Sequence, residues 1–577
     1  MNFTKIESKI IFFLILFAGM FGAARNALPA NIHAASCSQA DVQAAINAAS
    51  DADTVSVPAG NCTWTSGVTI TKGISLQGSG EASTIISSNG ILPLTIDLST
   101  GFARISQMTL FGNAPWGYIQ VDGSNASFRL DHLTFNDIPG DRGIKIESHS
   151  ANGYGQPPGS SPLKGLLDHI TLTDDSSKIF IALYGYSSSW NLPDNYGSDN
   201  AIYIEDSNFT WTGGAVGDVL DGECGARFVI RNNHITNGTI SYHDTGSTQE
   251  CRSTRKVEIY NNVFSGVNCN NKDCQYGAIS FRGGTGVYFN NIIPIFPNGY
   301  ENGATCEIFR VAYNTPGVPW SGSCDNIPEK VCSDFLTHCS VNHQVCSYSY
   351  NNPNGDCAPG TGPCVGSCSQ NSDCPTGTSC VQLDGQLDST GWPCRDQTGR
   401  GQDDPVTHIQ ASSPAYWWNN LNAYKRCGNA FSRYCAGGTH TQCWSDDNDC
   451  NKYVPGDVCL DSCSSDNDCP SGKTCGYYPT NVLTAQYSGQ IKPNRDYYSD
   501  LDWQPDGSAG VGIGAMASRP STCTPGVGYW ATDQNRLYKC TATNIWNLYY
   551  TPYTYPHPLQ GSSDTTPPAA PTGLAVN

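Results

Sequence analysis

The sequence predicts an all-β fold, a right-handed parallel β-helix (solenoid) with an N-terminal capping helix, a disulfide-rich insertion and a small C-terminal β region. A six-residue frame of strand, polar kink and strand recurs at gaps of 25, 37, 37, 26, 29 and 29 residues. A constant frame with irregular spacing is typical of stacked coils, because insertions leave the stack as loops. The seven copies begin at Ile105, Leu130, Leu167, Ile204, Ile230, Ile259 and Tyr288.

Asparagine pairs occupy the kink of the last three copies, at 232–233, 261–262 and 290–291. Asparagine tolerates the left-handed backbone that a tight kink between strands requires. Stacked asparagine side chains can also donate hydrogen bonds to one another along the axis of the stack. The pairs therefore support a fold in which each coil lies on the previous one.

Residues 36–64 are predicted to form the cap of this stack. Ala40 to Ala49 has apolar residues at helical spacing, and a first strand follows from Thr54. An amphipathic cap protects the open end of a stack from edge-to-edge pairing. We expect a disulfide between Cys37 and Cys62 to attach the helix to the first coil.

This start, from Cys37 through Gln77-Gly-Ser-Gly, resembles the N-terminus of many pectate-lyase-like β-helix proteins. The resemblance covers roughly residues 37–295 and concerns the superfamily and its fold. The Arg-Pro motif of pectate lyases and the Asn-Thr-Asp-Gly and Arg-Ile-Lys motifs of polygalacturonases are not evident in the chain. The resemblance therefore implies a fold and no closer family.

The N-terminus and the composition indicate export. Residues 1–34 read as a signal peptide, with Lys5 and Lys9 before the apolar stretch Ile10–Ala18 and small residues near Ala34. That stretch is short for a membrane span, and an uncleaved anchor is the alternative. Twenty-seven cysteines fit an oxidising compartment, and the odd total leaves one thiol free or paired with another chain. The net charge of −19 argues against binding of nucleic acid.

The remaining chain divides by composition. The β-helix is expected over 35–300 and Cys-rich disulfide modules over 301–480, where nineteen of the cysteines lie. Four aspartates in the modules suit either bound calcium or Asx-turns: Asp447, Asp449, Asp466 and Asp468. An aromatic-rich β region follows over 481–560, with a Cys523–Cys540 disulfide as its staple. Residues 561–577 read as a linker that resembles the entry to a fibronectin type III domain.

A third strand lies between successive frames, and each copy ends its apolar run on a residue that can do chemistry. Parallel strands stack at about 4.8 Å per coil, so these residues should form one column along a groove. In pectate-lyase-like proteins, the resemblance implies, this strand carries the active site. The column consists of Asp122, Glu147, Tyr184, Asp221, His243 and Arg282.

Two reactions suit such a column. A hydrolase needs an acid and a base carboxylate, which Asp122, Glu147 and Asp221 can supply in pairs. A β-eliminating lyase needs a base and positive charge for the developing enolate. For the lyase, His243 is the candidate base, and Asp221 and Asp244 orient it or hold calcium. The candidate cations are Arg282, Arg252 and Arg255. The alternative is that the column is surface filling or bonds one coil to the next.

Aromatic residues crowd one loop and a neighbouring coil. Exposed rings beside a polar groove suit stacking on sugars, because the C–H face of a pyranose is apolar. Loop packing is the alternative. The loop residues are Tyr184, Tyr186, Trp190 and Tyr196, and those on the neighbouring coil are Trp116 and Tyr118.

These features favour a secreted polysaccharide-active protein that cleaves an acidic extracellular glycan by β-elimination, with hydrolysis next. Its partner is then an extracellular polysaccharide, and calcium is a candidate cofactor. The alternative function is a non-catalytic cell-surface adhesin or structural β-helix protein, which the many cysteines and the missing family motifs also fit.

Overall fold

The computed structural model describes residues 28–293 except 124–125, 141, 149–162, 186, 243–252 and 266–277, short segments between 304 and 486, and residues 493–561. The linker 562–577, most of the signal peptide and most of the Cys-rich modules lie outside the described residues. Residues 31–33, which the sequence analysis placed in the signal peptide, form β1 (Asn31–His33) and pair with β2. A cleavage after residue 34 would therefore remove a strand of the first coil.

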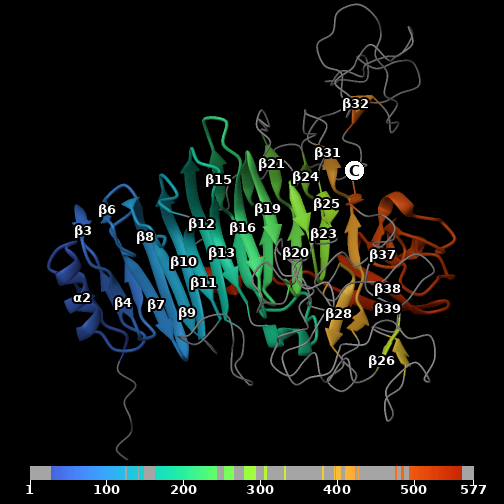
Figure 1. Cartoon of the computed structure of the whole chain (residues 1–577), viewed down its shortest axis with the longest axis horizontal. Helices are drawn as coiled ribbons and strands as arrows, with labels where there is room; N and C mark the ends of the chain where they lie inside the picture. The colour runs from blue at the N-terminus through green and yellow to red at the C-terminus, as the bar shows by residue number, and fades with distance from the viewer. Residues whose placement is uncertain are drawn as a thin grey trace, which may run out of the picture.

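Most of the described strands lie in two large sheets in which every printed pairing is parallel. Figure 1 shows these strands side by side from the N-terminal helix to the C-terminal sheet. The ten-stranded sheet contains β4 (Val68–Ile70), β7 (Leu94–Leu98), β9 (Ile119–Gly123), β11 (Arg142–Glu147), β13 (Ile179–Tyr184), β16 (Gly217–Glu223), β19 (Gly238–Tyr242), β22 (Ile279–Phe281), β25 (Ala304–Glu307) and β34 (Leu483–Gln486).

The nineteen-stranded sheet consists of two rows that are joined where β8, β10 and β12 run through the kink. Its first row contains β1, β2 (Thr54–Ser56), β5 (Ser75–Gln77), β8 (Gly101–Asn113), β10 (Ala126–Phe135), β12 (Lys164–Asp174), β14 (Ile202–Glu205), β17 (Arg227–Arg231), β20 (Lys256–Tyr260), β23 (Thr285–Phe289), β30 (Ala415–Trp418) and β35 (Tyr497–Ser499). Its second row adds β3 (Gly60–Trp64), β6 (Thr84–Asn89), β15 (Asn208–Trp211), β18 (His234–Thr236), β21 (Val263–Ser265), β24 (Ile292–Ile293) and β31 (Leu421–Asn422).

Equivalent residues of successive six-residue frames pair with one another in this sheet, so the predicted repeat sets its register. Leu130 pairs with both Ile105 and Leu167, and the series continues without a shift to Tyr288, which pairs with Trp417. Residues 417–422 are thus an eighth copy, beyond an insertion. Short antiparallel pairs lie in the inserted region: β26 (Lys330–Cys332) with β27 (Cys380–Gln382), β28 (Arg400–Asp403) with β29 (Gln410–Ser412), and β32 (Arg426–Cys427) with β33 (Cys475–Gly476).

The third residue of every copy has a left-handed backbone. The values of φ lie between 49° and 58° in all eight copies, which only a few residue types adopt without strain. This confirms the predicted role of asparagine at the kink. The eight residues are Gln107, His132, His169, Asp206, Asn232, Asn261, Asn290 and Asn419.

The fourth residue of the later copies forms a buried ladder. The Asn233 side-chain amide donates to Asn262 Oδ1 at 3.0 Å, and Asn262 donates in the same way to Asn291 at 3.0 Å. Asn291 then donates to Asn420 at 2.8 Å across the insertion. The expected hydrogen bonds between stacked asparagines are therefore confirmed. His132 and His169, the third residues of two earlier adjacent copies, stack with their ring centroids 4.7 Å apart.

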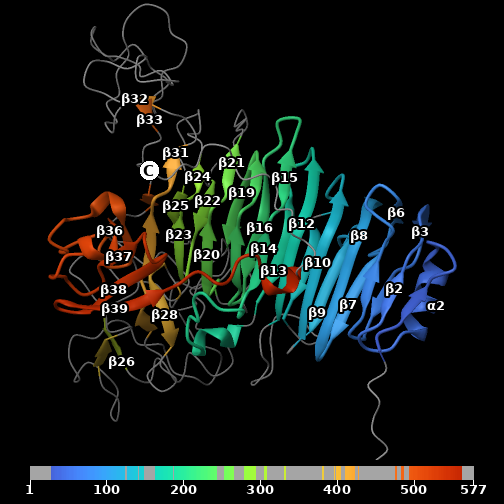
Figure 2. The same cartoon turned by 180° about the vertical axis from the view of Figure 1, so that it is seen from behind.

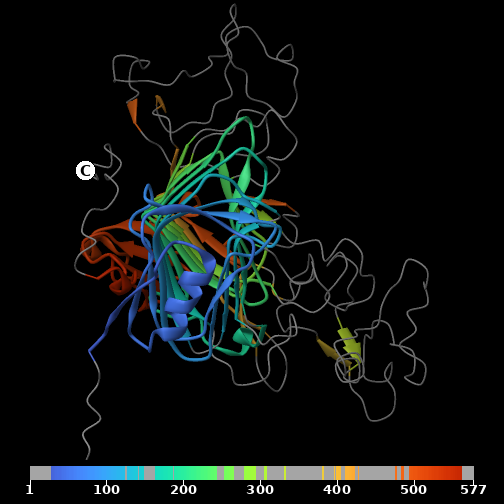
Figure 3. The same cartoon turned by 90° about the vertical axis from the view of Figure 1, so that its left-hand side faces the viewer.

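The N-terminal end is closed by α2 (Gln39–Ala48), which Figure 3 shows at the near end of the stack. Ser38 caps the helix by accepting the Asp41 N–H, and Val42, Ala45 and Ile46 are buried against the first coils. The predicted Cys37–Cys62 disulfide is present and joins the segment before α2 to β3. The cap is thus built as the apolar spacing of its sequence indicates.

The C-terminal region forms a four-stranded sheet of β36 (Val511–Gly514), β37 (Gly528–Ala531), β38 (Arg536–Ala542) and β39 (Ile545–Tyr550), with three short 3-10 helices (η6, Asp500–Asp502; η7, Met516–Ser518; η8, Pro558–Gln560). This agrees with the aromatic-rich β region expected from the sequence, and the Cys523–Cys540 disulfide is confirmed. One face of this sheet packs on the stack, where Trp530 contacts the rings of Phe289 and Trp418.

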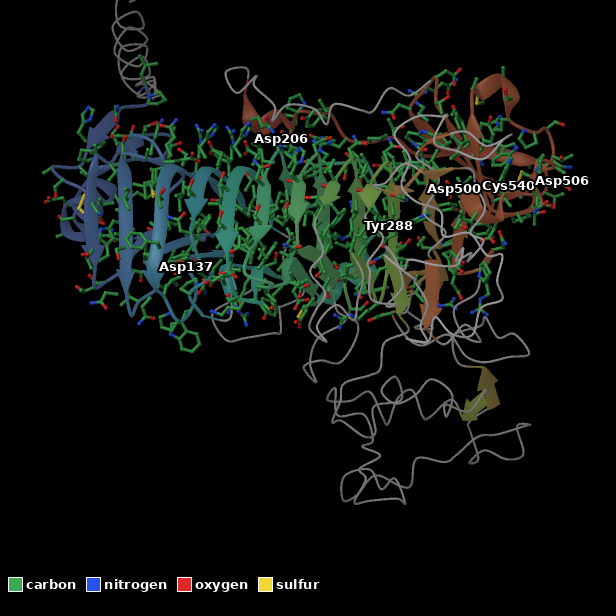
Figure 4. The ribbon with its side chains drawn as sticks, turned by 90° about the horizontal axis from the view of Figure 1, so that it is seen from above. Asp137, Asp206, Tyr288, Asp500, Asp506 and Cys540 are labelled. Atoms are coloured by element: carbon green, nitrogen blue, oxygen red, sulfur yellow. A yellow bond between two sulfur atoms is a disulfide. The ribbon has the colours of Figure 1, made fainter. Side chains whose placement is uncertain are left out.

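Residues 551–561, here called the strap, run back from this sheet along the outside of the nineteen-stranded sheet (Figure 2). Arg231 donates to the carbonyls of Tyr553 and Thr554, and Arg129 donates to that of Gln560. These arginines also pair with carboxylates beneath the strap, Arg129 with Asp168 and Arg231 with Glu205. Figure 4 shows Asp206 and Asp137 at opposite edges of the stack, with Tyr288 farther along it toward the C-terminal sheet.

We expect Asn262→Ala to lower the free energy of unfolding by about 2–4 kcal/mol, because it removes the buried acceptor of the Asn233 backbone N–H and side-chain amide and one donor to Asn291 Oδ1. Urea unfolding followed by circular dichroism measures this. Asn261→Gly is the matched control: it removes the neighbouring amide side chain but keeps a residue that accepts the left-handed backbone. Equal losses in the two variants would contradict a specific role for the ladder.

His557 in the strap should make stability depend on pH. Its Nδ1 accepts the Leu559 N–H at 3.2 Å, and burial together with Arg231 lowers the pKa of His557 to about 4. The unfolded chain takes up this proton near pH 6.5, so the stabilisation is complete above pH 6.5 and is lost as the pH falls toward 4. We expect the stability difference between the native protein and His557→Gln to shrink by up to about 1.4 kcal/mol per pH unit in that window. Urea unfolding between pH 7 and pH 4.5 measures it, and a constant difference would contradict the prediction.

Candidate functional site

The outer face of the ten-stranded sheet carries the predicted column. Side chains alternate along each strand, so in β11 Ile144 and Ile146 are fully buried while Lys145 keeps 28% of its side chain exposed. The register places Asp122 beside Glu147 and Glu147 beside Tyr184. Half of the six predicted residues therefore form one row along adjacent coils.

Asp221 does not belong to that row. Tyr184 pairs with Glu223, whereas Asp221 lies two residues earlier and pairs with Ala182 and Ser241. In β16 the apolar residues Val219 and Leu220 are followed directly by Asp221, two residues before the position opposite Tyr184. The end of the apolar run therefore predicts Asp221 for the column, whereas Glu223 continues the row.

The C-terminal part of the column is only partly described. Arg282 follows β22 and is 7% exposed, and its Nη2 donates to Ser241 Oγ at 2.7 Å on the previous coil. This contact joins Arg282 to the row that contains Asp221. Four predicted site residues lie outside the described residues: Tyr186, His243, Asp244 and Arg252.

The best-defined group on this face surrounds Tyr184 and is here called the Tyr184 cluster: Arg142, Lys145, Glu147 and Tyr184. Arg142 Nη1 donates to the Tyr184 hydroxyl at 2.6 Å. Lys145 Nζ lies 5.6 Å from the centre of the Tyr184 ring and forms an ion pair with Glu147. On the previous coil, Gln120 donates to Asp122 Oδ2 at 2.7 Å. The cluster thus brings a phenol, two cations and a carboxylate together.

Trp190 and Arg255 are not available to a substrate. Both are fully buried, and the Arg255 guanidinium lies 5.0 Å from the Trp190 ring centre. Trp190 Nε1 donates to the Ser253 carbonyl at 2.9 Å, and Arg255 pairs with Asp194. The 3-10 helix η1 (Ser187–Asn191) turns Trp190 toward the stack, so the expectation that these two residues bind substrate is wrong, and they instead hold the loop in place.

Trp116 is the exposed aromatic residue next to the cluster, with 73% of its surface accessible. It precedes Gly117, whose Cα approaches the backbone of Arg142 and Gly143 so closely that a Cβ there would lie 3.1 Å from the Arg142 carbonyl. Tyr118 is buried and donates to Asp137. Trp116 therefore sits on a firmly held turn beside the start of β11.

Cation sites are not evident in the described part of the chain. Among its residues, no group of three or more His, Cys, Asp or Glu side chains is placed to hold a metal ion. The four module aspartates considered for calcium lie outside it. No described helix is long and apolar enough to cross a membrane.

The chain shows only distant similarity to known proteins. No family model matches the chain, and no curated protein matches it. An alginate lyase from Paenibacillus sp. str. FPU-7 is 12% identical, with a TM-score of 0.26, over 45% of this chain and 94% of its own. The A-module of the Azotobacter vinelandii mannuronan C-5 epimerase is 16% identical, with a TM-score of 0.19, over 44% of this chain and 90% of its own. With TM-scores this low, neither similarity indicates what this protein does.

Proposed function

We propose that this protein is a secreted right-handed β-helix enzyme that cleaves an acidic extracellular polysaccharide by β-elimination on the outer face of the ten-stranded sheet. The observation that carries the proposal is the Tyr184 hydroxyl at 2.6 Å from Arg142 Nη1, with Lys145 beside the same ring. The Tyr184 hydroxyl, which can transfer a proton, thus lies next to the positive charges of Arg142 and Lys145.

This arrangement suits β-elimination of a uronate. The reaction removes the proton on the carbon next to the carboxylate, breaks the C–O bond to the leaving sugar and forms a C=C bond. A cation must stabilise the enolate that develops on the carboxylate, and Arg142 or Lys145 supplies it. A hydrogen bond donated by Arg142 stabilises negative charge on the Tyr184 oxygen, so that this oxygen can exchange a proton with the sugar.

Hydrolysis is the second candidate. Asp122 and Glu147 face each other across adjacent strands, which lie about 4.8 Å apart, close to the separation of about 5 Å that retaining glycosidases use. Glu147 is, however, 7% exposed and paired with Lys145. Because the Lys145 ammonium already engages the Glu147 carboxylate, this pair suits hydrolysis less well than the cluster suits elimination.

Incubation with a panel of polyuronates and neutral glycans, with calcium or with chelator, tests the function. We expect ultraviolet absorbance of unsaturated products from a polyuronate and a loss of about 10²–10⁴-fold in kcat for Tyr184→Phe. Tyr498→Phe is the matched control, since it removes one hydroxyl at the far end of the stack. Reducing ends without absorbance would establish hydrolysis instead. No product from any glycan would favour the non-catalytic surface protein.

Trp116 should contribute to substrate binding and not to the chemical step. We expect Trp116→Ala to raise KM about tenfold with kcat nearly unchanged, because stacking on an exposed ring is lost and the Tyr184 cluster is kept. Steady-state kinetics on the cleaved polyuronate measure both constants. Leu501→Ala, which shortens an apolar residue that is 40% exposed elsewhere, should change neither. A drop in kcat with constant KM would contradict this role.

A further inference from the structure

Arg519 is held between two aromatic rings on the C-terminal sheet. Its Cζ lies 4.7 Å from the Tyr538 ring centre and 5.4 Å from that of Trp546. Both rings are fixed by hydrogen bonds of their own: Trp546 Nε1 donates to the Pro520 carbonyl at 2.9 Å, and the Tyr538 hydroxyl donates to Gln534 at 2.6 Å. The guanidinium plane is therefore positioned before any ligand arrives.

The charge of Arg519 is not balanced in the described structure. The buried Arg231 and Arg255, by contrast, pair with Glu205 and Asp194. Among the described residues Arg519 forms no ion pair, and no acceptor lies within hydrogen-bond reach of its buried Nη1. Burial also lowers the pKa of this guanidinium. A planar, unpaired guanidinium is suited to bind an oxyanion through two parallel hydrogen bonds.

The rings lie on the face of the sheet that points away from the stack. Tyr538 pairs with Leu548, and Cys540 pairs with Trp546, so these side chains share one face. The opposite face carries Trp530 and Tyr550, which pack on the stack. Leu548 is 52% exposed, and Arg519, Tyr538 and Trp546 are each partly exposed. An apolar surface with a central cation is thus open to solvent.

We propose that Arg519, Tyr538 and Trp546 form an accessory binding site for a uronate residue of an acidic polysaccharide. The uronate carboxylate binds the guanidinium fork, and the apolar face of the pyranose ring lies along Trp546 and Leu548. The proposal rests on the proposed function for the choice of an acidic glycan. Such a site, on a sheet that packs against the nineteen-stranded side of the stack, would tether a long polymer whose other residues can reach the Tyr184 cluster.

Isothermal titration of the full chain with oligogalacturonate and with oligoalginate tests the site. The Tyr184→Phe background prevents cleavage during the measurement. We expect Arg519→Lys to weaken binding of one of these polyuronates about tenfold, because lysine keeps the charge but not the planar fork. Arg536→Ala is the matched control: it removes one positive charge from an exposed position on the same sheet and should leave the affinity unchanged.

The outcomes separate this site from the proposed reaction. Loss of affinity in Arg519→Lys, with an unchanged thermal midpoint, supports the site whether or not any glycan is cleaved. Cleavage that disappears in Tyr184→Phe supports the reaction independently. The site is overturned if Arg519→Lys binds both polyuronates like the Tyr184→Phe parent, if Arg536→Ala loses as much affinity, or if a neutral oligosaccharide binds equally well in an Arg519-dependent way.

Discussion

The left-handed kink at the third position of each frame is the constraint on which the rest of the structure depends. It turns the chain at the same point in eight copies and thereby keeps successive strands in register. A shift of one residue would turn every core side chain of a strand outward. The Asn233–Asn420 ladder adds a second fixed point beside the kink, and it spans the insertion without a break. The row Asp122, Glu147 and Tyr184 exists because this register holds.

Two outer faces of the same stack carry charge, and burial distinguishes their roles. Beneath the strap, Arg231 and Glu205 are fully buried, paired and hydrogen-bonded to residues that lie more than 300 positions later. Buried pairs of this kind are costly to break and suit attachment of one part of a protein to another. On the ten-stranded sheet, Lys145 is 28% exposed and sits beside a phenol. The first face is closed by the chain itself, and the second keeps part of a charged side chain exposed to solvent.

The sequence predicts those features of the structure that restrict residue type, and it does not predict contacts that form only in the folded chain. The frame is visible because left-handed backbone and a buried ladder restrict residue type, and Cys37–Cys62 follows from the position of the cap. Asp221 was placed wrongly because the end of an apolar run does not fix which residue of β16 pairs with Tyr184. Trp190 was placed wrongly because the sequence of an aromatic loop is the same whether its rings face solvent or pack on the core, and Trp190 is fully buried. Arg519 gave no signal, since its neighbours Tyr538 and Trp546 meet it only through the fold of the sheet.

The strap also relates the two proposed binding surfaces. It returns from the C-terminal sheet to Arg129, and Trp530 packs that sheet on Trp418 of the stack. Contacts at both ends leave the sheet little freedom to rotate against the coils, so Arg519 stays at a fixed place relative to the Tyr184 cluster. A polymer held at Arg519 then loses less conformational freedom when it reaches the second surface than one arriving from solution. A rigid attachment through buried charges therefore favours long glycan chains over short ones as substrates.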